Sequence, residues 1–492
     1  MSEEKVVVKL IKKPLKSERE EIRQKKRHKF YVFLLCLCIF LAGTGVGFGA
    51  TFLRKYTLYV SHSNNKFDEI KDYMKKVWLY SDEYEDLDTL LEDKAFYGMT
   101  NFADDRYTTY MSKEQLSGYV QNINKNYVGI GIQYYTINNN FIVEKIFKDS
   151  PAENAGMHVG DVVTKISGVD ISDKTSDEIK ELVLGEEGTV VEIVVQRGNQ
   201  EITLNVVRGQ VDSTVYAEGY EDYVLLEISS FGNNTANEII KYLDEYLEKD
   251  KLIIDLRNNG GGYEKAAREV AGLFLGDDAI LMNEVYNNGD KQVVKVISNR
   301  HYTNFKKVVI LTNENTASAA EVFTIAMKEQ LAGVSQVGIT TYGKGIVLST
   351  YTLTDGSALK MSVAYWTSPN GVFIDKEGIK PDVEVYLDEL MYMSLYEIGD
   401  QTFKYDEVSS YVEVCQRALN FVGYPVDRTD GYFDKSTEKM VEKYRKDKGL
   451  SASNIIDKEF YDALLLEVDY LSLTDKSKDL QMLKAIEIIR ED

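Results

Sequence analysis

The chain has 492 residues, of which 44% are hydrophobic and 28% charged, and its formal net charge at pH 7 is -21. This composition excludes wholesale disorder, and the length allows about three domains. An acidic chain repels a nucleic-acid backbone, so nucleic-acid binding is not expected.

The N-terminal region predicts a membrane anchor. Residues 1–29 are rich in Lys and Arg, and residues 30–53 contain no charged side chain. A helix of that length, at about 1.5 Å per residue, crosses a hydrocarbon core of about 30 Å. The basic flank predicts an N-terminus in the cytoplasm and an acidic remainder outside it. A buried helix and a cleaved signal peptide are the alternatives, but the apolar run is longer than a signal peptide usually has.

Two overlapping GxxxG spacings at residues 43–49 would let such a span pair with a second copy, so the sequence is compatible with a homo-oligomer. Cys36 and Cys38 fall in the expected span, which leaves Cys415 alone outside it. A region with one cysteine has no internal disulfide framework.

Beyond the span, the hydrophobic pattern divides the chain into four segments. Helical spacing is followed by short alternating strands with turns, then by strands alternating with helices, and last by a small helical bundle. The alternation of strands and helices predicts βα units on a central sheet. The expected elements are helices within 67–91; a β-rich module at 127–208 with a helix near 177–184; strands at 224–229, 252–256 and 308–312 with helices at 235–247, 263–273 and 319–328; and a bundle at 412–468.

Histidine usage argues against two common hydrolase types. The chain has four histidines, and a Ser-His-Asp triad would have to use His301. The zinc signature HExxH is absent, so neither a metal nor another cofactor is expected.

A serine and a lysine remain as candidates for catalysis. Ser318 stands where a predicted strand turns into a helix, a place where a nucleophile can lie beside the first helical N–H groups. A helix N-cap is the structural alternative for this serine. Lys344 lies between Gly343 and Gly345. Burial would lower its pKa and let it accept a serine proton, whereas a solvated loop lysine is the plainer alternative.

A glycine-rich turn provides a third element. The stretch DLRNNGGG at residues 255–262 follows a predicted strand, and glycines there suit a backbone oxyanion hole. Phosphate binding is the rival interpretation, but no GKS or GKT follows.

Together these stretches resemble the carboxyl-terminal processing peptidases, also called tail-specific proteases. The matching motifs follow the family order over about 300 residues: NFADDRYTTY at 101–110, GIGI at 129–132, a PDZ-like pattern at 150–161, ISSF at 228–231, DLR with its glycines at 255–262, TASAAE at 316–321, GKG at 343–345 and GIKPD at 378–382. The resemblance implies that Ser318 is the nucleophile and Lys344 the general base. It also implies that Gly261 and Ala319 supply oxyanion N–H groups.

One position departs from the family pattern. Family members commonly have a glutamine four residues after the lysine, where it orients the amine, and this chain has Leu348. Leucine cannot make that hydrogen bond. The departure supports an alternative function, a proteolytically inactive scaffold that binds through its PDZ and wall-binding modules. A signalling subunit is a weaker alternative, because a tail of 29 residues is too short to form a folded domain.

The resemblance also implies two binding modules. A PDZ module adds an extended C-terminal peptide as a strand and binds its carboxylate through backbone N–H groups, here those of Val128, Gly129, Ile130 and Gly131; a fixed spacer is the alternative. The C-terminal segment, with DGYFD at residues 430–434, resembles a peptidoglycan-binding helical module. Cell-wall peptidoglycan is therefore an expected partner.

The expected protein is a multidomain α+β chain with a single N-terminal transmembrane helix, a β-rich PDZ module, an α/β serine-protease core and a small helical C-terminal domain. Its expected function is that of a membrane-anchored, extracytoplasmic serine endopeptidase that cleaves exported proteins selected by their C-termini. The expected segments are a cytoplasmic tail at 1–29, the span at 30–53, an N-terminal helical part at 54–120, the PDZ domain at 121–210, the Ser/Lys protease core at 211–395 and the peptidoglycan-binding-like domain at 400–475.

Overall fold

The computed structural model describes residues 23, 25–32, 65–137 and 140–491. Most of the expected span at 30–53, including the GxxxG spacings, lies outside these residues. Among the residues that are described, no helix is both long and apolar enough to cross a bilayer. The chain divides into two units, residues 1–98 and 99–492, and each is described by itself.

The first unit contains the helices expected within 67–91. They are α3 (Lys66–Val77), the short η1 (Ser81–Glu83) and α4 (Leu87–Thr100), whose last residues extend into the second unit. Asn65 caps α3 by accepting from the Phe67 N–H, at 3.0 Å. Lys71 of α3 forms ion pairs with Asp88 and Glu92 of α4, so charge as well as packing joins the two helices.

The β-rich module of the second unit is a six-stranded sheet with the order β3-β4-β5-β7-β8, and β6 pairs with β5. Alternate strand residues such as Phe141, Val163 and Ile193 form its core with Ile179 of α7. The expected strands and helix are thereby confirmed. The elements of this region are β1 (Thr109–Met111), α5 (Lys113–Asn124), β2 (Asn126–Gly129), β3 (Ile132–Ile137), β4 (Asn140–Ile146), α6 (Pro151–Asn154), β5 (Val162–Ile166), β6 (Val169–Asp170), α7 (Ser176–Val183), β7 (Val190–Arg197), β8 (Gln200–Val207) and β9 (Gly209–Asp212).

The central sheet has the order β10-β11-β12-β15-β16-β19 and is parallel from β11 to β19. Parallel strands are joined by crossover helices, as the alternating pattern predicts. The elements are β10 (Val215–Gly219), β11 (Val224–Ile228), α8 (Thr235–Leu243), β12 (Lys251–Asp255), α9 (Glu264–Leu275), β15 (Lys307–Thr312), α10 (Ala319–Gln330), β16 (Val334–Gly338) and β19 (Val383–Glu384).

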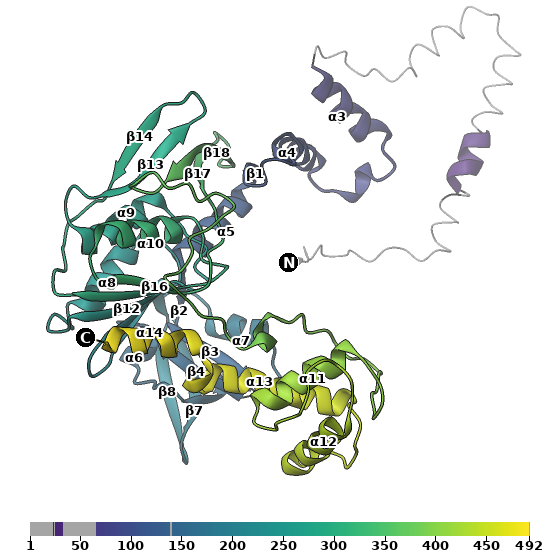
Figure 1. Ribbon diagram of the computed structural model, residues 1–492. Helices are drawn as coiled ribbons and strands as arrows, with labels where there is room; N and C mark the ends of the chain where they lie inside the picture. Colours follow the sequence, from purple (N-terminus) through teal and green to yellow (C-terminus); the bar gives the residue numbers. More distant parts are fainter. Residues whose placement is uncertain (1–22, 24, 33–64, 138–139, 492) are drawn as a thin grey trace, which may run out of the picture. The chain divides into compact units, whose positions relative to one another are not determined.

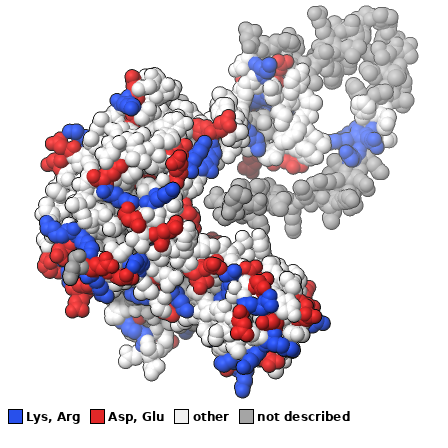
Figure 2. All heavy atoms as spheres, in the orientation of Figure 1, with Lys and Arg blue, Asp and Glu red and all other residues white. Residues whose placement is uncertain are grey.

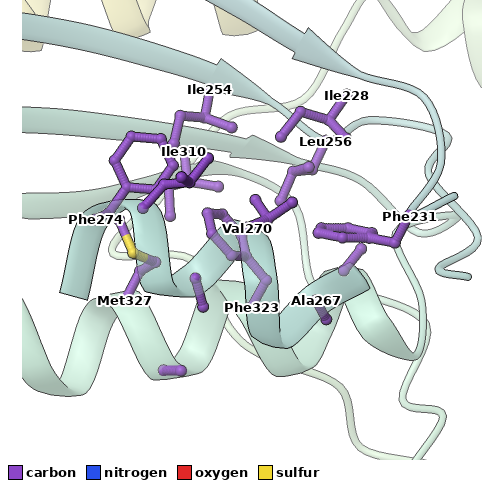
Figure 3. Close-up of a cluster of buried hydrophobic side chains, with 14 of the residues drawn as sticks. Ile228, Phe231, Ile254, Leu256, Ala267, Val270, Phe274, Ile310, Phe323 and Met327 are labelled. Atoms are coloured by element: carbon purple, nitrogen blue, oxygen red, sulfur yellow. The ribbon is translucent and has the colours of Figure 1, made fainter. Parts of the chain in front are cut away.

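Both faces of this sheet are covered. Ile254 and Ile310 pack against Val270 of α9 and Phe323 of α10 (Figure 3). The intervening residues, such as Ile253, point to the opposite face because side chains alternate along a strand. Figure 1 shows α9 and α10 on one side of the sheet and α14, in yellow, on the other.

A second sheet was not expected from the sequence. It is antiparallel, with the order β1-β18-β13-β14 and with β17 paired to β18. Its remaining strands are β13 (Ile280–Tyr286), β14 (Lys291–Lys295), β17 (Ile346–Thr352) and β18 (Ala358–Thr367). This sheet matters for function because β17 begins two residues after Lys344.

The helical bundle at 412–468 is confirmed. It consists of η2 (Glu389–Tyr392), α11 (Ser410–Phe421), α12 (Lys435–Lys448) and α13 (Lys458–Thr474), around a core that includes Cys415, Phe433 and Phe460. On its visible face Lys/Arg and Asp/Glu are intermixed (Figure 2). After it, η3 (Lys476–Lys478) leads to α14 (Leu480–Arg490), which packs Ala485 and Ile489 on the central sheet.

Candidate active site

Ser318 lies immediately before α10, and its backbone is strained. Its φ is 57° and its ψ is -119°, whereas an ordinary N-cap residue has an extended backbone. A non-glycine residue with this conformation is uncommon and marks a position under functional constraint. Ser318 is the N-cap residue of α10 and forms a capping box with Glu321, so it occupies the expected cap position. Its strained backbone is also typical of a nucleophile at a sharp strand-to-helix turn.

The turn that carries Ser318 is held by the loop that follows β12. The Thr316 hydroxyl donates to the carbonyl oxygen of Leu256 at 2.8 Å, and the Ala317 N–H donates to the carbonyl oxygen of Asn259 at 2.9 Å. The serine turn and the glycine-rich turn are therefore built as one unit.

The lysine loop approaches neighbouring backbone closely, which is why glycines flank Lys344. A Cβ added at Gly343 would lie 2.7 Å from the Gly378 nitrogen, and one added at Gly345 would lie 2.5 Å from the Asp375 Cβ. The Trp366 indole N–H donates to the Lys344 carbonyl oxygen at 2.9 Å. Side chains at these two positions would therefore collide with the neighbouring loop.

Glu321 joins the serine turn to the lysine loop. Its carboxylate is fully buried. One oxygen accepts from the N–H groups of Ser318 (2.8 Å) and Lys344 (2.9 Å), and the other accepts from the Gly343 N–H (2.7 Å) and the Thr341 hydroxyl (2.5 Å). This one side chain therefore sets the spacing between the two candidate catalytic residues.

Ser318 and Lys344 line one cleft, which has a volume of about 530 Å³. Ala319, Gly261 and Leu348 line the same cleft. The structure thus brings together four of the predicted site residues and the residue that replaces the usual glutamine.

The environment of the Lys344 amine favours its neutral form. Its pKa is lowered to about 8, mainly by burial and also by the positive charges of Lys360 and Arg106, while the Glu321 carboxylate acts in the opposite direction. Its Nζ lies 5.0 Å from the centre of the Tyr107 ring. Within the described residues, this Nζ has no hydrogen-bond acceptor and no ion-pair partner. A lysine with such a pKa can act as a base near neutral pH.

The glycine-rich turn touches the serine directly. A Cβ added at Gly261 would lie 2.9 Å from both the Ala319 nitrogen and the Ser318 Cβ. The Gly261 N–H donates to the side-chain oxygen of Asn259 at 2.8 Å. The Ala319 N–H has no acceptor in the described part of the chain, so it is the open donor of the two expected oxyanion groups.

A second cavity, of about 500 Å³, lies between β3 and α7. Ile130 and Gly131 line it, and their carbonyl oxygens accept from the N–H groups of Ala152 (2.8 Å) and Phe147 (3.1 Å). Because β3 ends its sheet, its outer edge is available to a further strand. The other two expected peptide-binding residues, Val128 and Gly129, do not line this groove. They belong to β2, which pairs with β9.

No described histidine lines the catalytic cleft. His301 is exposed, and its Nε2 lies 3.2 Å from the carbonyl oxygen of Phe274. In the described ranges, no three His, Cys, Asp or Glu side chains are grouped to hold a metal ion.

Three site residues were missed from the sequence. Glu321 stands three residues after Ser318, a capping-box spacing that could have revealed it. Tyr107 lies in the motif at residues 101–110, which had no role assigned from the sequence. No sequence pattern marks Lys360 as a site residue, because it reaches the cleft only through the pairing of β17 with β18.

Comparisons with known proteins agree with this geometry. The peptidase family S41 model matches residues 222–385, a PDZ domain model matches 142–197, and a peptidoglycan binding domain model matches 409–464. The chain is 32% identical over 438 residues to the carboxy-terminal processing protease CtpA of Bacillus subtilis (strain 168), covering 88% of this chain and 92% of that protein. The chain belongs to peptidase family S41.

A second relative of this S41 peptidase is a CtpA-like serine protease of Staphylococcus haemolyticus (strain JCSC1435), which is 31% identical over 476 residues and covers 92% of each chain. Among solved structures, a photosystem II D1 C-terminal processing protease is 25% identical, with a TM-score of 0.37, and the match covers 65% of this chain and 86% of that one. The chain is a carboxyl-terminal processing serine protease with a PDZ domain and a C-terminal helical region.

Proposed function

We propose that this S41 peptidase is a membrane-anchored, extracytoplasmic endopeptidase in which Ser318 is the nucleophile and Lys344 the general base. The observation that carries the proposal is the buried Glu321 carboxylate, which accepts from the backbone N–H groups of both residues. A pKa of about 8 for Lys344 supports its role as a base.

In this mechanism the neutral Lys344 amine accepts the Ser318 hydroxyl proton as the Ser318 oxygen attacks the scissile carbonyl. The Ala319 N–H stabilises the oxyanion, and the Gly261 N–H joins it by exchanging its bond to Asn259 for one to the substrate. The Lys344 ammonium then protonates the leaving amine as the C–N bond breaks. Water then attacks the acyl-enzyme as Lys344 takes one of its protons. The ester C–O bond to Ser318 breaks, Lys344 returns the proton to the Ser318 oxygen, and the product leaves with a new carboxyl terminus.

The PDZ module selects substrates by their C-termini in this proposal. The unpaired β3 edge and the N–H groups of Ile130 and Gly131 suit an extended peptide with a free carboxylate. Asn122 and Lys125, at the end of α5, line both the PDZ groove and the catalytic cleft. A peptide bound in the groove therefore has a continuous route to Ser318.

Membrane anchoring through residues 30–53, with the catalytic region outside the cytoplasm, rests on the charge pattern of the sequence. Binding to peptidoglycan rests on the domain model at 409–464. Protease treatment of intact and of lysed cells tests the topology: digestion of the catalytic region in intact cells is expected, and protection until lysis would contradict it. Co-sedimentation of the full chain with purified sacculi tests wall binding.

Cleavage of an unstructured protein by the full chain in detergent micelles tests the catalytic assignment. Ser318→Ala and Lys344→Arg should both abolish cleavage, since an arginine does not give up its proton near neutral pH. A zinc chelator should have no effect. Full activity of Ser318→Ala would overturn the assignment.

Paired substrates test the selection step. A chain that ends in a free carboxylate after small apolar residues should be cut faster than its C-terminal amide. Gly131→Ala should remove this preference, because its φ is 78° and an added Cβ would lie 2.4 Å from the Ser150 Cβ. Gly168→Ala is the matched control, with a φ of 77° and open space around it. Equal rates for the two substrates with the wild-type chain would contradict selection by the terminus.

A further inference from the structure

The motif at residues 101–110 lies beside the catalytic lysine. Tyr107 from this segment is half-buried, and its ring centre is 5.0 Å from the Lys344 Nζ. A cation within about 6 Å of an aromatic ring is attracted by the negative face of the ring. Tyr107 is therefore placed to interact with Lys344 whenever that amine carries a proton.

Asp105 fixes the position of Tyr107. One oxygen of its carboxylate accepts from the backbone N–H groups of Tyr107 and Thr108, both at 3.1 Å. The same oxygen accepts from the Ser362 hydroxyl at 2.9 Å, and the other accepts from the Thr108 hydroxyl at 2.6 Å. The Ser362 N–H in turn donates to the Thr108 hydroxyl at 3.0 Å.

This network ties the segment to the strand that faces the lysine. Ser362 lies on β18 directly opposite Leu348 of β17. The position that lacks the usual glutamine and the anchor of Tyr107 are therefore cross-strand partners, and both belong to the sheet that continues from the lysine loop.

Arg106 also connects Tyr107 to the lysine loop. Its guanidinium donates to the Tyr107 hydroxyl at 3.0 Å and lies 5.4 Å from the ring centre of Tyr342. Tyr342 is held by its N–H, which donates to the carbonyl oxygen of Thr316 at 3.0 Å. The Tyr107 ring is thus held from both its backbone and its hydroxyl.

We infer that Tyr107 is a positioning residue for catalysis, which holds the Lys344 amine over its ring face and stabilises the ammonium that forms when the Ser318 proton is transferred. Asp105 acts through Tyr107 by holding its backbone. The inference rests on the proposed Ser318 and Lys344 catalysis. Tyr107 also gives the Lys344 ammonium a partner in a site where Leu348 cannot provide one.

The chemical reason is that the contact is stronger after proton transfer than before it. A neutral amine gains little from the ring, whereas the ammonium gains from the ring's negative face. Only an interaction that strengthens on the way to the transition state raises kcat. The ring therefore lowers the barrier to proton transfer without tightening substrate binding.

Replacement of Tyr107 by another aromatic residue and by an aliphatic residue tests the inference in the full chain. Tyr107→Phe keeps the ring face and should retain kcat within about threefold. Tyr107→Leu keeps apolar bulk without a ring face and should lower kcat by roughly 3- to 30-fold, with KM unchanged. Tyr351→Leu is the matched control, since Tyr351 is an exposed tyrosine on β17 of the same sheet and does not line the cleft.

The pH profile separates this role from simple packing. The charged groups that act on Lys344 are Arg106, Lys360 and Glu321. Because Arg106 also lies 5.1 Å from the centre of the Tyr107 ring, the two Tyr107 variants are compared in an Arg106→Gln background, where the other charged groups are the same. Loss of the ring face in Tyr107→Leu should move the acidic limb of kcat/KM to lower pH relative to Tyr107→Phe, because the ammonium loses its attraction. If Tyr107 acted only by packing, and the two variants had the same melting temperature, the acidic limb of kcat/KM would lie at the same pH in both.

A double-mutant cycle tests the link to Asp105. Asp105→Ala should lower kcat, and the double variant with Tyr107→Leu should be no slower than the slower single variant, because both changes remove one contact. Equal kcat for Tyr107→Leu and Tyr107→Phe would overturn the inference. Retained activity in Ser318→Ala, measured beside them, would instead overturn the proposed catalysis.

Discussion

Arg257 and Asp479 form an ion pair with a nitrogen-to-oxygen distance of 2.8 Å, although 222 residues separate them in the chain. Arg257 also pairs with Asp255 at the end of β12, and it belongs to the glycine-rich turn at residues 255–262. Asp479 is the N-cap of α14. The C-terminal helix is therefore tied to the strand end that helps to form the active site.

Loss of packing by α14 should destabilise the protease core. Ile489 is fully buried against the central sheet, so Ile489→Ala should lower the free energy of unfolding by about 2–5 kcal/mol. Leu483 lies on the exposed side of the same helix at 42% exposure, and Leu483→Ala should change stability by about 0.5 kcal/mol or less. The free energy of unfolding of each variant is measured by urea titration, with the loss of proteolytic activity as the readout. Similar values for the two variants would show that α14 is not part of the folded core.

Replacement of Glu321 should impair both stability and catalysis. Glu321→Gln replaces one carboxylate oxygen with an N–H₂ group that faces N–H or O–H donors, at a cost of about 1–3 kcal/mol for each bond lost. The spacing of Ser318 and Lys344 then relaxes, and a shift of about 1 Å can reduce kcat about a hundredfold.

Glu329→Gln is the control for Glu321, since Glu329 on the same helix accepts from the Ser368 hydroxyl (2.6 Å) and the Asn370 N–H (2.8 Å). It should lower the melting temperature without changing kcat. A Glu321→Gln enzyme with normal kcat would show that its carboxylate does not position the site.

Activity should rise with pH as Lys344 loses its proton, with the acidic limb of kcat/KM near its pKa of about 8. Lys360→Met removes a nearby positive charge, so the pKa of Lys344 should rise and the limb should move to higher pH. Lys328→Met is the control, because Lys328 does not line the cleft and pairs with Asp382. An unmoved limb in Lys360→Met would contradict the electrostatic role of Lys360.

The same pKa predicts an effect on stability. The pKa of Lys344 falls from 10.5 to about 8, so between these values the unfolded chain binds more protons than the folded chain. The cost of burying this lysine therefore lowers the free energy of unfolding by its full amount below about pH 8, and the cost disappears above pH 10.5. Lys344→Met should raise the melting temperature at pH 7 and have less effect at pH 10, as measured by calorimetry on the inactive variant.

Leu348→Gln tests how the amine is oriented in this enzyme. Leu348 is half-buried, lines the cleft with Lys344 and has Ser362 as its cross-strand partner. If Tyr107 already holds the amine, Leu348→Gln should change kcat little in the wild-type background and should restore activity in Tyr107→Leu. A large gain in the wild-type background would show that the amine is poorly oriented. No activity in any background would favour the inactive scaffold.

Hydrophobic periodicity in the sequence was sufficient to predict the β-rich module, the alternating strands and helices, and the C-terminal bundle. These patterns are local, because side chains alternate along a strand and repeat every 3.6 residues along a helix. Ser318 and Lys344 were likewise proposed as candidates from their own neighbours, the strand-to-helix junction and the flanking glycines.

What only the tertiary structure decided depends on contacts between distant segments. The antiparallel sheet brings Lys360 to Lys344, and Asp105 bonds to Ser362 across 257 residues. Ile489 returns to the central sheet after a whole intervening module. No local pattern encodes such contacts, since each arises from burial and hydrogen bonding that exist only once the chain has folded. The sequence alone therefore determined which residues could carry the chemistry, and the fold decided which groups tune and position them.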